Sequence, residues 1–217
     1  MYHGSQAFWA FGTKGICNMN IFYLDKDPYL AARYHCDKHV VKMILETCQI
    51  LASVHHRWGN GHNVTYKETH KNHPSTKWAG DSNANYLWLV KLGKYLLLEY
   101  ADRYGKTHKC NTYLYGELES PPKNMYIGGS LEPAFCAPPA CMPDEYKVGQ
   151  EPRTKEETVE SYRNYYLGAK AHMAKWKLGN VPDFMTRGMN TCKKTSTSST
   201  STDLTPESGT HQTTSVL

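Results

Sequence analysis

The sequence predicts a mostly α protein: one compact helical domain with a long proline-rich loop and a disordered tail. Three observations support this fold class. Apolar residues recur with the 3.6-residue period of a helix, helix-start signals precede those stretches, and most of the prolines gather between residues 116 and 153. The 217 residues are 40% hydrophobic and 21% charged, which suits one globular domain with a tail.

Composition divides the chain into three parts. Residues 1–18 show no clear period, and Met19 opens the stretch "MNIFYLD", so we expect 1–18 to be an N-terminal extension; an ordinary flexible N-terminus is the alternative. Residues 19–185 form the expected helical domain. Residues 186–217 are rich in Ser and Thr and almost free of large apolar side chains, which predicts a disordered tail because too little surface can be buried.

The expected elements follow in chain order. "MNIFYLD" is a short strand or an extended entry, and Asp27 with Pro28 begins a helix. Apolar residues at 40, 41, 44, 48 and 51 continue a helix over 35–51, and a further helix starts around 75–77. A long, largely buried helix runs from Ser82 to Gly105. Thr154 and Glu157 form a capping box that opens a last helix, expected to end at Gly179.

The helix expected over 35–51 carries an unusual polar face. On a helical wheel His35, His39, Lys42 and Glu46 lie opposite the apolar stripe, and Lys38 adds a second amine. An ordinary solvated face explains this pattern as well as a site does. As a site, a cationic ridge with one carboxylate suits an anionic ligand and a single acid/base group. Paired histidines also permit a metal, although two are not a complete ligand set.

Other candidate nucleic-acid contacts lie further along the chain. His73 either binds phosphate or caps the turn before the next helix, which we favour. Lys106 and His108 form a basic loop after the long helix. On the last helix basic residues alternate with aromatic ones, as in proteins that hold phosphates and stack on bases. The candidates there are Arg163, Tyr165, Tyr166, Lys170 and Lys175, although a plain amphipathic helix is equally compatible.

Two short motifs resemble the endonuclease V type of pyrimidine-dimer DNA glycosylases. Asp37-x-His39-x6-Glu46 is similar to the Asp-x-His-x6-Glu run on that family's first helix, and residues 162–170 are similar to its aromatic-basic run near the C-terminus. The resemblance implies a compact all-α fold, Glu46 as the catalytic acid and His39 in the DNA cleft. Most of residues 19–180 also resembles a family common in tailed-phage genomes, which implies a phage origin and no particular activity.

The sequence departs from the glycosylase pattern at the nucleophile and at two cations. That family uses the α-amine exposed by removal of its initiator Met, whereas here Asn20 follows Met19, and Asn disfavours that removal. Its arginines immediately before and three residues after the Glu are replaced by Leu45 and Gln49. Lys42 or Lys38 is therefore a candidate substitute, as cation or as amine.

Three classes of function stay open on these grounds. The first is a base-excision glycosylase and AP lyase, or a related base-modifying enzyme, acting on damaged or modified pyrimidines, with Glu46, His39 and Lys42 as catalytic residues. The second is a non-catalytic nucleic-acid-binding phage protein, and the third is a metal-dependent hydrolase. Net charge +5 fits double-stranded DNA as partner. We expect no cofactor, no bound metal and no membrane contact.

The expected location is the cytoplasm, that of a host cell if a phage encodes the protein. The seven cysteines are irregularly spaced, unlike a secreted disulfide framework. No run of about 18 apolar residues and no secretory signal pattern is present.

Overall fold

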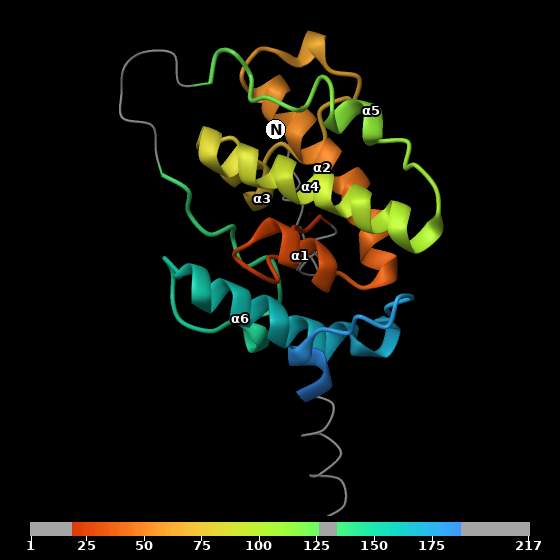
Figure 1. Ribbon diagram of the computed structural model, residues 1–217. Coiled ribbons are helices and arrows are strands. Elements are labelled where there is room, and N and C mark those ends of the chain that lie inside the picture. The colour runs from red at the N-terminus through yellow and green to blue at the C-terminus, as the bar shows by residue number, and fades with distance from the viewer. Residues whose placement is uncertain (1–18, 126–133, 188–217) are drawn as a thin grey trace, which may run out of the picture.

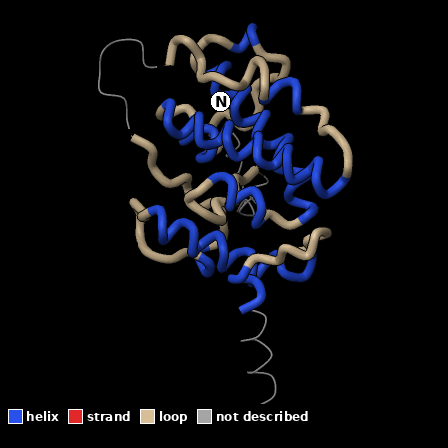
Figure 2. Tube along the Cα trace, viewed as in Figure 1, coloured by secondary structure: helices blue, strands red, loops and turns tan. Residues whose placement is uncertain are grey.

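The structure is a computed structural model that describes residues 19–125 and 134–187. These residues form helices and loops without any strand, so the predicted mostly α class is confirmed (Figures 1 and 2). The expected extension 1–18, and the expected tail from residue 188 onward, lie outside the described residues. The α-helices are α1 (Pro28–Tyr34), α2 (Asp37–Arg57), α3 (Pro74–Ala79), α4 (Asn83–Tyr104), α5 (Asn111–Leu114) and α6 (Lys155–Tyr165).

Residues 183–187 are also α-helical, and four short turns belong to other helix types. The 3-10 turns are η1 (Gly61–Asn63), η2 (Asp144–Tyr146) and η4 (Ala171–Met173), and η3 (Tyr166–Lys170) is a π-helical turn. Apart from η2, the described part of the proline-rich stretch 116–153 forms no helix, as expected of a loop. None of the described helices is both long and apolar enough to cross a membrane.

Helices α2 and α4 form the centre of the molecule. They run antiparallel: the start of α2 lies against the end of α4, and Gly93 of α4 lies against Thr47 of α2. A Cβ at position 93 would come within 2.9 Å of the Thr47 side chain, so glycine permits this close approach. Helix α1 packs across α4, and α3 packs on α2. Trp78, Tyr86 and Trp88 lie in the core between these helices.

The predicted helix ends agree with the structure at several places. Asp27 accepts the backbone N–H of Tyr29 at the start of α1. Ser82 caps α4, which ends at Gly105 in the left-handed conformation. The capping box of Thr154 and Glu157 is present at the start of α6. Each of these signals is local, which is why sequence alone reveals it.

The prediction of one helix over residues 35–51 is wrong at its beginning. Helix α1 ends at Tyr34, and α2 begins only at Asp37 after extended backbone at His35 and Cys36. The buried guanidinium of Arg103 on α4 stabilises this corner, because it donates to the carbonyl oxygens of Arg33 (3.2 Å) and His35 (2.8 Å). A distant side chain thus satisfies carbonyls that a continuous helix would have bonded internally.

The last predicted helix also ends earlier than expected. Helix α6 stops at Tyr165, the π-helical turn and a 3-10 turn follow, and the chain is extended from Ala174. The segment then returns to the start of α2, where the carbonyl of Lys175 accepts the N–H of Asp37 (2.8 Å) and Asp37 accepts the N–H of Lys177 (3.2 Å). These contacts take the place of continued helical bonds.

Candidate active site

The first described residues lie against the middle of α2. The backbone N–H of Asn20 donates to Oε2 of Glu46 at 3.2 Å, and both residues are buried. Glu46 retains only 7% of its surface exposed. The stretch "MNIFYLD" forms no strand and enters the domain against α2, and its second residue is a direct partner of the predicted catalytic acid.

The side chain of Asn20 fixes the position of its own backbone. Its Oδ1 accepts the N–H groups of Ile21 (2.8 Å) and Phe22 (3.2 Å), and its Nδ2 donates to the carbonyl of Cys141 (2.8 Å). Phe22 adopts φ +51°, a left-handed conformation that is costly for an aromatic residue. The cost is offset by these bonds and by packing, since Phe22 is almost fully buried.

Glu46 has a second nitrogen beside it. Nζ of Lys42, one turn earlier on α2, lies 2.9 Å from Oε1, while the Lys42 side chain stays 55% exposed. One carboxylate thus contacts a backbone nitrogen on its buried side and a primary amine on its solvent side. A carboxylate in this position can take a proton from an attacking amine and stabilise positive charge on a sugar.

His39, two turns before Glu46 on α2, is also buried. Its ring stacks on Phe22, with 4.2 Å between centroids and an interplanar angle of 22°, and its Nδ1 lies 2.5 Å from the hydroxyl oxygen of Tyr166. Burial, assisted by nearby His35, Lys170 and Lys42, lowers the pKa of His39 to about 3. The imidazole is therefore neutral near pH 7 and can donate or accept a hydrogen bond without carrying charge.

The predicted arrangement of the two faces of this helix needs correction. Val41, assigned to the core, is 40% exposed, whereas His39 and Glu46, assigned to a solvated ridge, are covered. The reason is that residues 19–22 and the π-helical turn pack over the polar face, which the sequence pattern of α2 alone does not show. Leu45 is also 40% exposed, so an apolar strip lies beside Lys42.

Five lysines lie on α2 or on segments that contact it, and we refer to them as the lysine rim. Lys42 and Lys170 both act electrostatically on His39. Lys38 lies on the first turn of α2, and the backbone bonds of Asp37 bring Lys175 and Lys177 to the same end of the helix. The lysine rim is thus Lys38, Lys42, Lys170, Lys175 and Lys177, and four of the five were predicted as site residues. Such a cluster suits contacts with phosphates.

Two predicted DNA contacts lie in the core instead. His35 and Tyr166 have no exposed surface. The Nδ1–H of His35 donates to the Ala31 carbonyl (2.6 Å), and burial lowers its pKa to about 4. Their prediction as surface contacts is therefore wrong, because His35 ends α1 rather than facing outward on α2, and Tyr166 points inward from the π-helical turn. Tyr165, its neighbour, is partly exposed beneath Lys170, whose Nζ lies 4.7 Å from the ring centroid.

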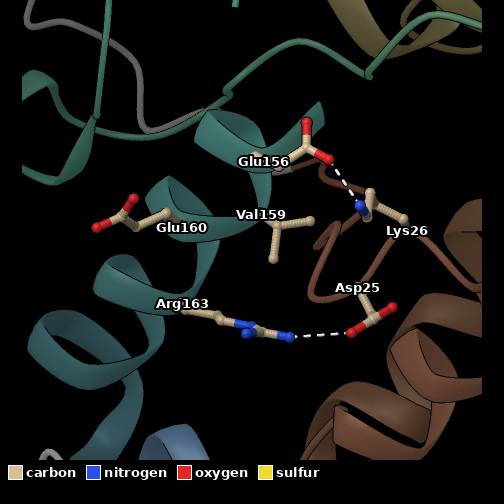
Figure 3. Close-up of a pocket in the computed structure, with 6 residues that line it drawn as sticks. All are labelled: Asp25, Lys26, Glu156, Val159, Glu160 and Arg163. Atoms are coloured by element: carbon tan, nitrogen blue, oxygen red, sulfur yellow. Dashed lines mark hydrogen bonds and ion pairs between the residues drawn. The ribbon is translucent and has the colours of Figure 1, made fainter. Parts of the chain in front are cut away.

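Arg163 is partly exposed and is engaged by partners within the protein. It donates to Oδ2 of Asp25 (2.9 Å) and to the carbonyl of Leu24 (2.9 Å), and the rings of Tyr34 and Phe184 flank it. Figure 3 shows this ion pair at a surface pocket between α6 and residues 25–26. The pocket's other cation, Lys26, pairs with Glu156 (2.6 Å) in the same view. Arg163 therefore links α6 to residues 24–25, and its contact with the DNA backbone stays a prediction.

The remaining predicted contacts lie at loops. His73 caps α3 by accepting the Ser75 N–H (3.1 Å), which agrees with the favoured turn interpretation. Lys106 is exposed just after α4, and His108 accepts the N–H of Cys110 (3.1 Å) while its ring packs edge-on against another aromatic side chain. Of these three, Lys106 best suits a phosphate contact.

The structure offers no support for the metal-dependent alternative. Among residues 19–125 and 134–187, no group of three or more His, Cys, Asp or Glu side chains is arranged to hold a metal ion. His35 and His39, the pair that suggested a metal, are separated by the helix break and bond to different partners.

Sequence reasoning missed two residues of this site, Asn20 and Phe22, and gave a third, Tyr166, a different role. Asn20 contributes its backbone nitrogen, Phe22 stacks on His39, and Tyr166 bonds to it from a segment more than 100 positions away. The sequence does carry a signal for Asn20, because this residue follows a methionine at the expected start of the domain. No local signal indicated Phe22, which looks like an ordinary core aromatic, and the aromatic-basic run predicted Tyr166 as a DNA contact rather than as a partner of His39.

Comparison with known proteins gives one match. Residues 19–112 match the family model of pyrimidine dimer DNA glycosylases. The match confirms the remote resemblance inferred from the motifs, and it includes Asn20, His39, Lys42 and Glu46. It supports a DNA glycosylase type of function in the broad sense, with DNA as the substrate. No curated protein and no solved structure matches the chain.

Proposed function

We propose that the protein is a DNA glycosylase with AP-lyase activity, acting on damaged or modified pyrimidines in double-stranded DNA. The observation that carries this proposal is the contact of Glu46 with two nitrogens, from Asn20 and Lys42, within the segment that matches the glycosylase family. A carboxylate beside an amine is what cleavage through an imine requires.

The reaction begins with attack of an amine on C1′ of the nucleotide. The glycosidic bond breaks as the new C–N bond forms, the base leaves with the bonding electrons, and Glu46 receives the amine's proton. Opening of the sugar ring then gives an iminium ion, which allows elimination of the 3′ phosphate and ends with hydrolysis of the imine. Extruding the base costs a few kcal/mol, least at a damaged pair, which favours damaged DNA.

The nucleophile depends on where the chain begins. Within a longer chain the nitrogen of Asn20 is an amide and cannot attack, so Lys42 is the amine beside Glu46. In a chain that begins at residue 20, the same nitrogen becomes an α-amine about 3.2 Å from the carboxylate. Lys42→Arg separates the two cases, because arginine keeps the positive charge but is not a nucleophile.

The lysine rim is the proposed contact surface for the DNA backbone. Lys42 and Lys170 act on His39, and Lys42 also pairs with Glu46 on its solvent side, while Lys38, Lys175 and Lys177 belong to segments that meet at the start of α2. Each phosphate contact of this kind adds affinity that falls with salt concentration. His39 is neutral, so its proposed role is a hydrogen bond in the cleft rather than a charge contact.

The experiment compares the full chain with chains begun at Met19 and at Asn20, each with Glu46→Gln and Lys42→Arg versions. Each is mixed with duplexes carrying a thymine dimer, another modified pyrimidine, an abasic site or no lesion, and borohydride is added. We expect a covalent protein–DNA band on lesion DNA and strand cleavage that Glu46→Gln reduces about 10²–10⁴-fold with DNA affinity retained. If the protein binds DNA but neither trapping nor cleavage occurs on any of the duplexes, it is instead a non-catalytic DNA-binding protein.

A further inference from the structure

The π-helical turn that follows α6 lies outside the segment that matches the glycosylase family, yet it reaches the candidate active site. Turns of this type insert one extra residue into a helix and redirect the side chains around it. Here Tyr166 points into the core, fully buried, while Lys170 stays near the surface with its Nζ over the Tyr165 ring. The turn therefore delivers an inward hydroxyl and an outward amine to the neighbourhood of His39.

The hydroxyl of Tyr166 is held at one ring nitrogen of His39. The Oη–Nδ1 distance is 2.5 Å, and the two rings meet edge to face, with 5.2 Å between centroids and an angle of 70°. On its other side the imidazole stacks on Phe22. A hydrogen bond and a stacked ring from two different segments fix both the tilt and the rotation of the imidazole.

The surroundings indicate which atom carries each proton. Burial raises the pKa of Tyr166, so the phenol keeps its proton, and burial lowers the pKa of His39, so the imidazole is neutral. The backbone and thiol of Cys36 also lie against the Tyr166 hydroxyl. A thiol sulfur is a weak acceptor compared with an imidazole nitrogen, so the phenolic O–H donates to Nδ1. The imidazole proton then resides on Nε2.

We propose that Tyr166 is a positioning residue that holds His39 as the Nε2–H tautomer, ready to donate to an oxygen of the bound DNA. The phosphate or sugar oxygen that receives this proton lies in the region surrounded by Lys42 and Lys170. The catalytic part rests on the proposed function, whereas the tautomer of the free protein does not.

The first test measures the tautomer directly, by nitrogen NMR of the full chain labelled at histidine. The expected result for His39 is an unprotonated, hydrogen-bonded Nδ1 and a protonated Nε2 at neutral pH. In Tyr166→Phe the preference for this tautomer should weaken, since the donor to Nδ1 is gone, while Cys36→Ala should leave it intact. A protonated Nδ1 in the unmodified protein would overturn the proposal, as would a His39 tautomer that Tyr166→Phe does not change.

A matched control exists elsewhere in the core. Tyr86 is equally buried, and its hydroxyl lies 2.9 Å from Nε2 of His55. Its own proton goes to the Leu118 carbonyl (3.0 Å), so here the hydroxyl accepts from the histidine. Tyr86→Phe therefore removes a buried tyrosine–histidine bond of the opposite direction, away from Glu46. It should alter the His55 signals and leave both the His39 signals and turnover unchanged.

Turnover gives the second readout. Tyr166→Phe should lower kcat about tenfold with KM unchanged, as expected from the loss of one orienting hydrogen bond. An unchanged kcat in a folded Tyr166→Phe protein would refute the catalytic part of the proposal. Failure of the proposed function would give a different result from failure of this proposal. The unmodified protein would then show no turnover on any duplex, while the tautomer of His39 could still be measured.

Discussion

Replacing Arg103 with methionine tests how the corner between α1 and α2 is held. The guanidinium is fully buried and donates to Glu99 (2.6 and 3.0 Å) and Asp37 (3.1 Å), as well as to the carbonyl oxygens of Arg33 and His35. Methionine fills much of the volume but leaves the buried Glu99 carboxylate without its partner. Removal of one member of such a buried pair costs about 3–5 kcal/mol.

The expected loss is large enough for ordinary unfolding measurements. For a domain of this size a loss of 1 kcal/mol lowers Tm by about 2–4 °C, so we expect a decrease of about 6–20 °C. Urea unfolding followed by circular dichroism should show a lower midpoint with an unchanged slope. Because the corner also places the start of α2, the His39 NMR signals should shift in the same variant.

Arg57 supplies the control for this prediction. It also pairs with an acid, Asp81 (3.1 Å), but both side chains are substantially exposed, so Arg57→Met should cost at most about 1 kcal/mol. Changing Glu99 to leucine together with Arg103→Met should recover part of the loss, since the unpaired carboxylate is removed as well. If Arg103→Met cost no more than Arg57→Met, the corner would not depend on this guanidinium, and the reasoning would be refuted.

Three further predictions concern DNA contact and pH. Leu45→Arg places a cation beside Glu46, where the resembled family has one, so DNA should bind more tightly and the slope of log affinity against log salt should steepen by about 0.9. Changing Lys38 and Lys170 to alanine should flatten that slope by about 1.8 in fluorescence-anisotropy titrations. For pH, His35 and His39 have pKa values of about 4 and 3, below the value of about 6.5 in an unfolded chain. The unfolded state takes up protons first, so these residues favour folding fully above pH ~6.5, and stability should fall below it by up to about 2.7 kcal/mol per pH unit in urea titrations.

Matched controls accompany these variants. Leu87→Arg adds the same charge at an exposed leucine of α4 outside the site and should change the salt slope little. Alanine at the exposed Lys91 and Lys123 should leave the slope near its original value. His62→Gln, at an exposed histidine, should not alter the pH dependence of unfolding. Equal effects of control and site variants would show that net charge alone accounts for the results.

The sequence predicts the helices of this fold wherever their signals are local. The α4 helix is flanked by a capping serine and a left-handed glycine, and both ends were placed to within a residue. The end of α1 was missed because the side chain that bonds its last carbonyl oxygens, Arg103, lies about seventy positions away in the sequence. The end of α6 was missed for a similar reason, since the returning segment bonds to Asp37.

The sequence predicts the central residues of the candidate site, but it does not predict the segments that cover them. Glu46, His39 and Lys42 share one helix, so their spacing alone brings them together. Their burial depends on the segment around Asn20 and on Tyr166, which no spacing on α2 predicts. The polar face therefore looked like a solvated surface until the two covering segments were placed.

Identification of the residue joined to DNA after borohydride treatment tests the central claim most directly. Trapped complexes of the full chain and of a chain begun at Asn20 would be digested and the modified peptide sequenced by mass spectrometry. The account predicts linkage at Lys42 in the full chain, and at Lys42 or the Asn20 α-amine in the shorter one, since both nitrogens contact Glu46. Linkage at a lysine away from Glu46, or no linkage in either chain, would contradict it.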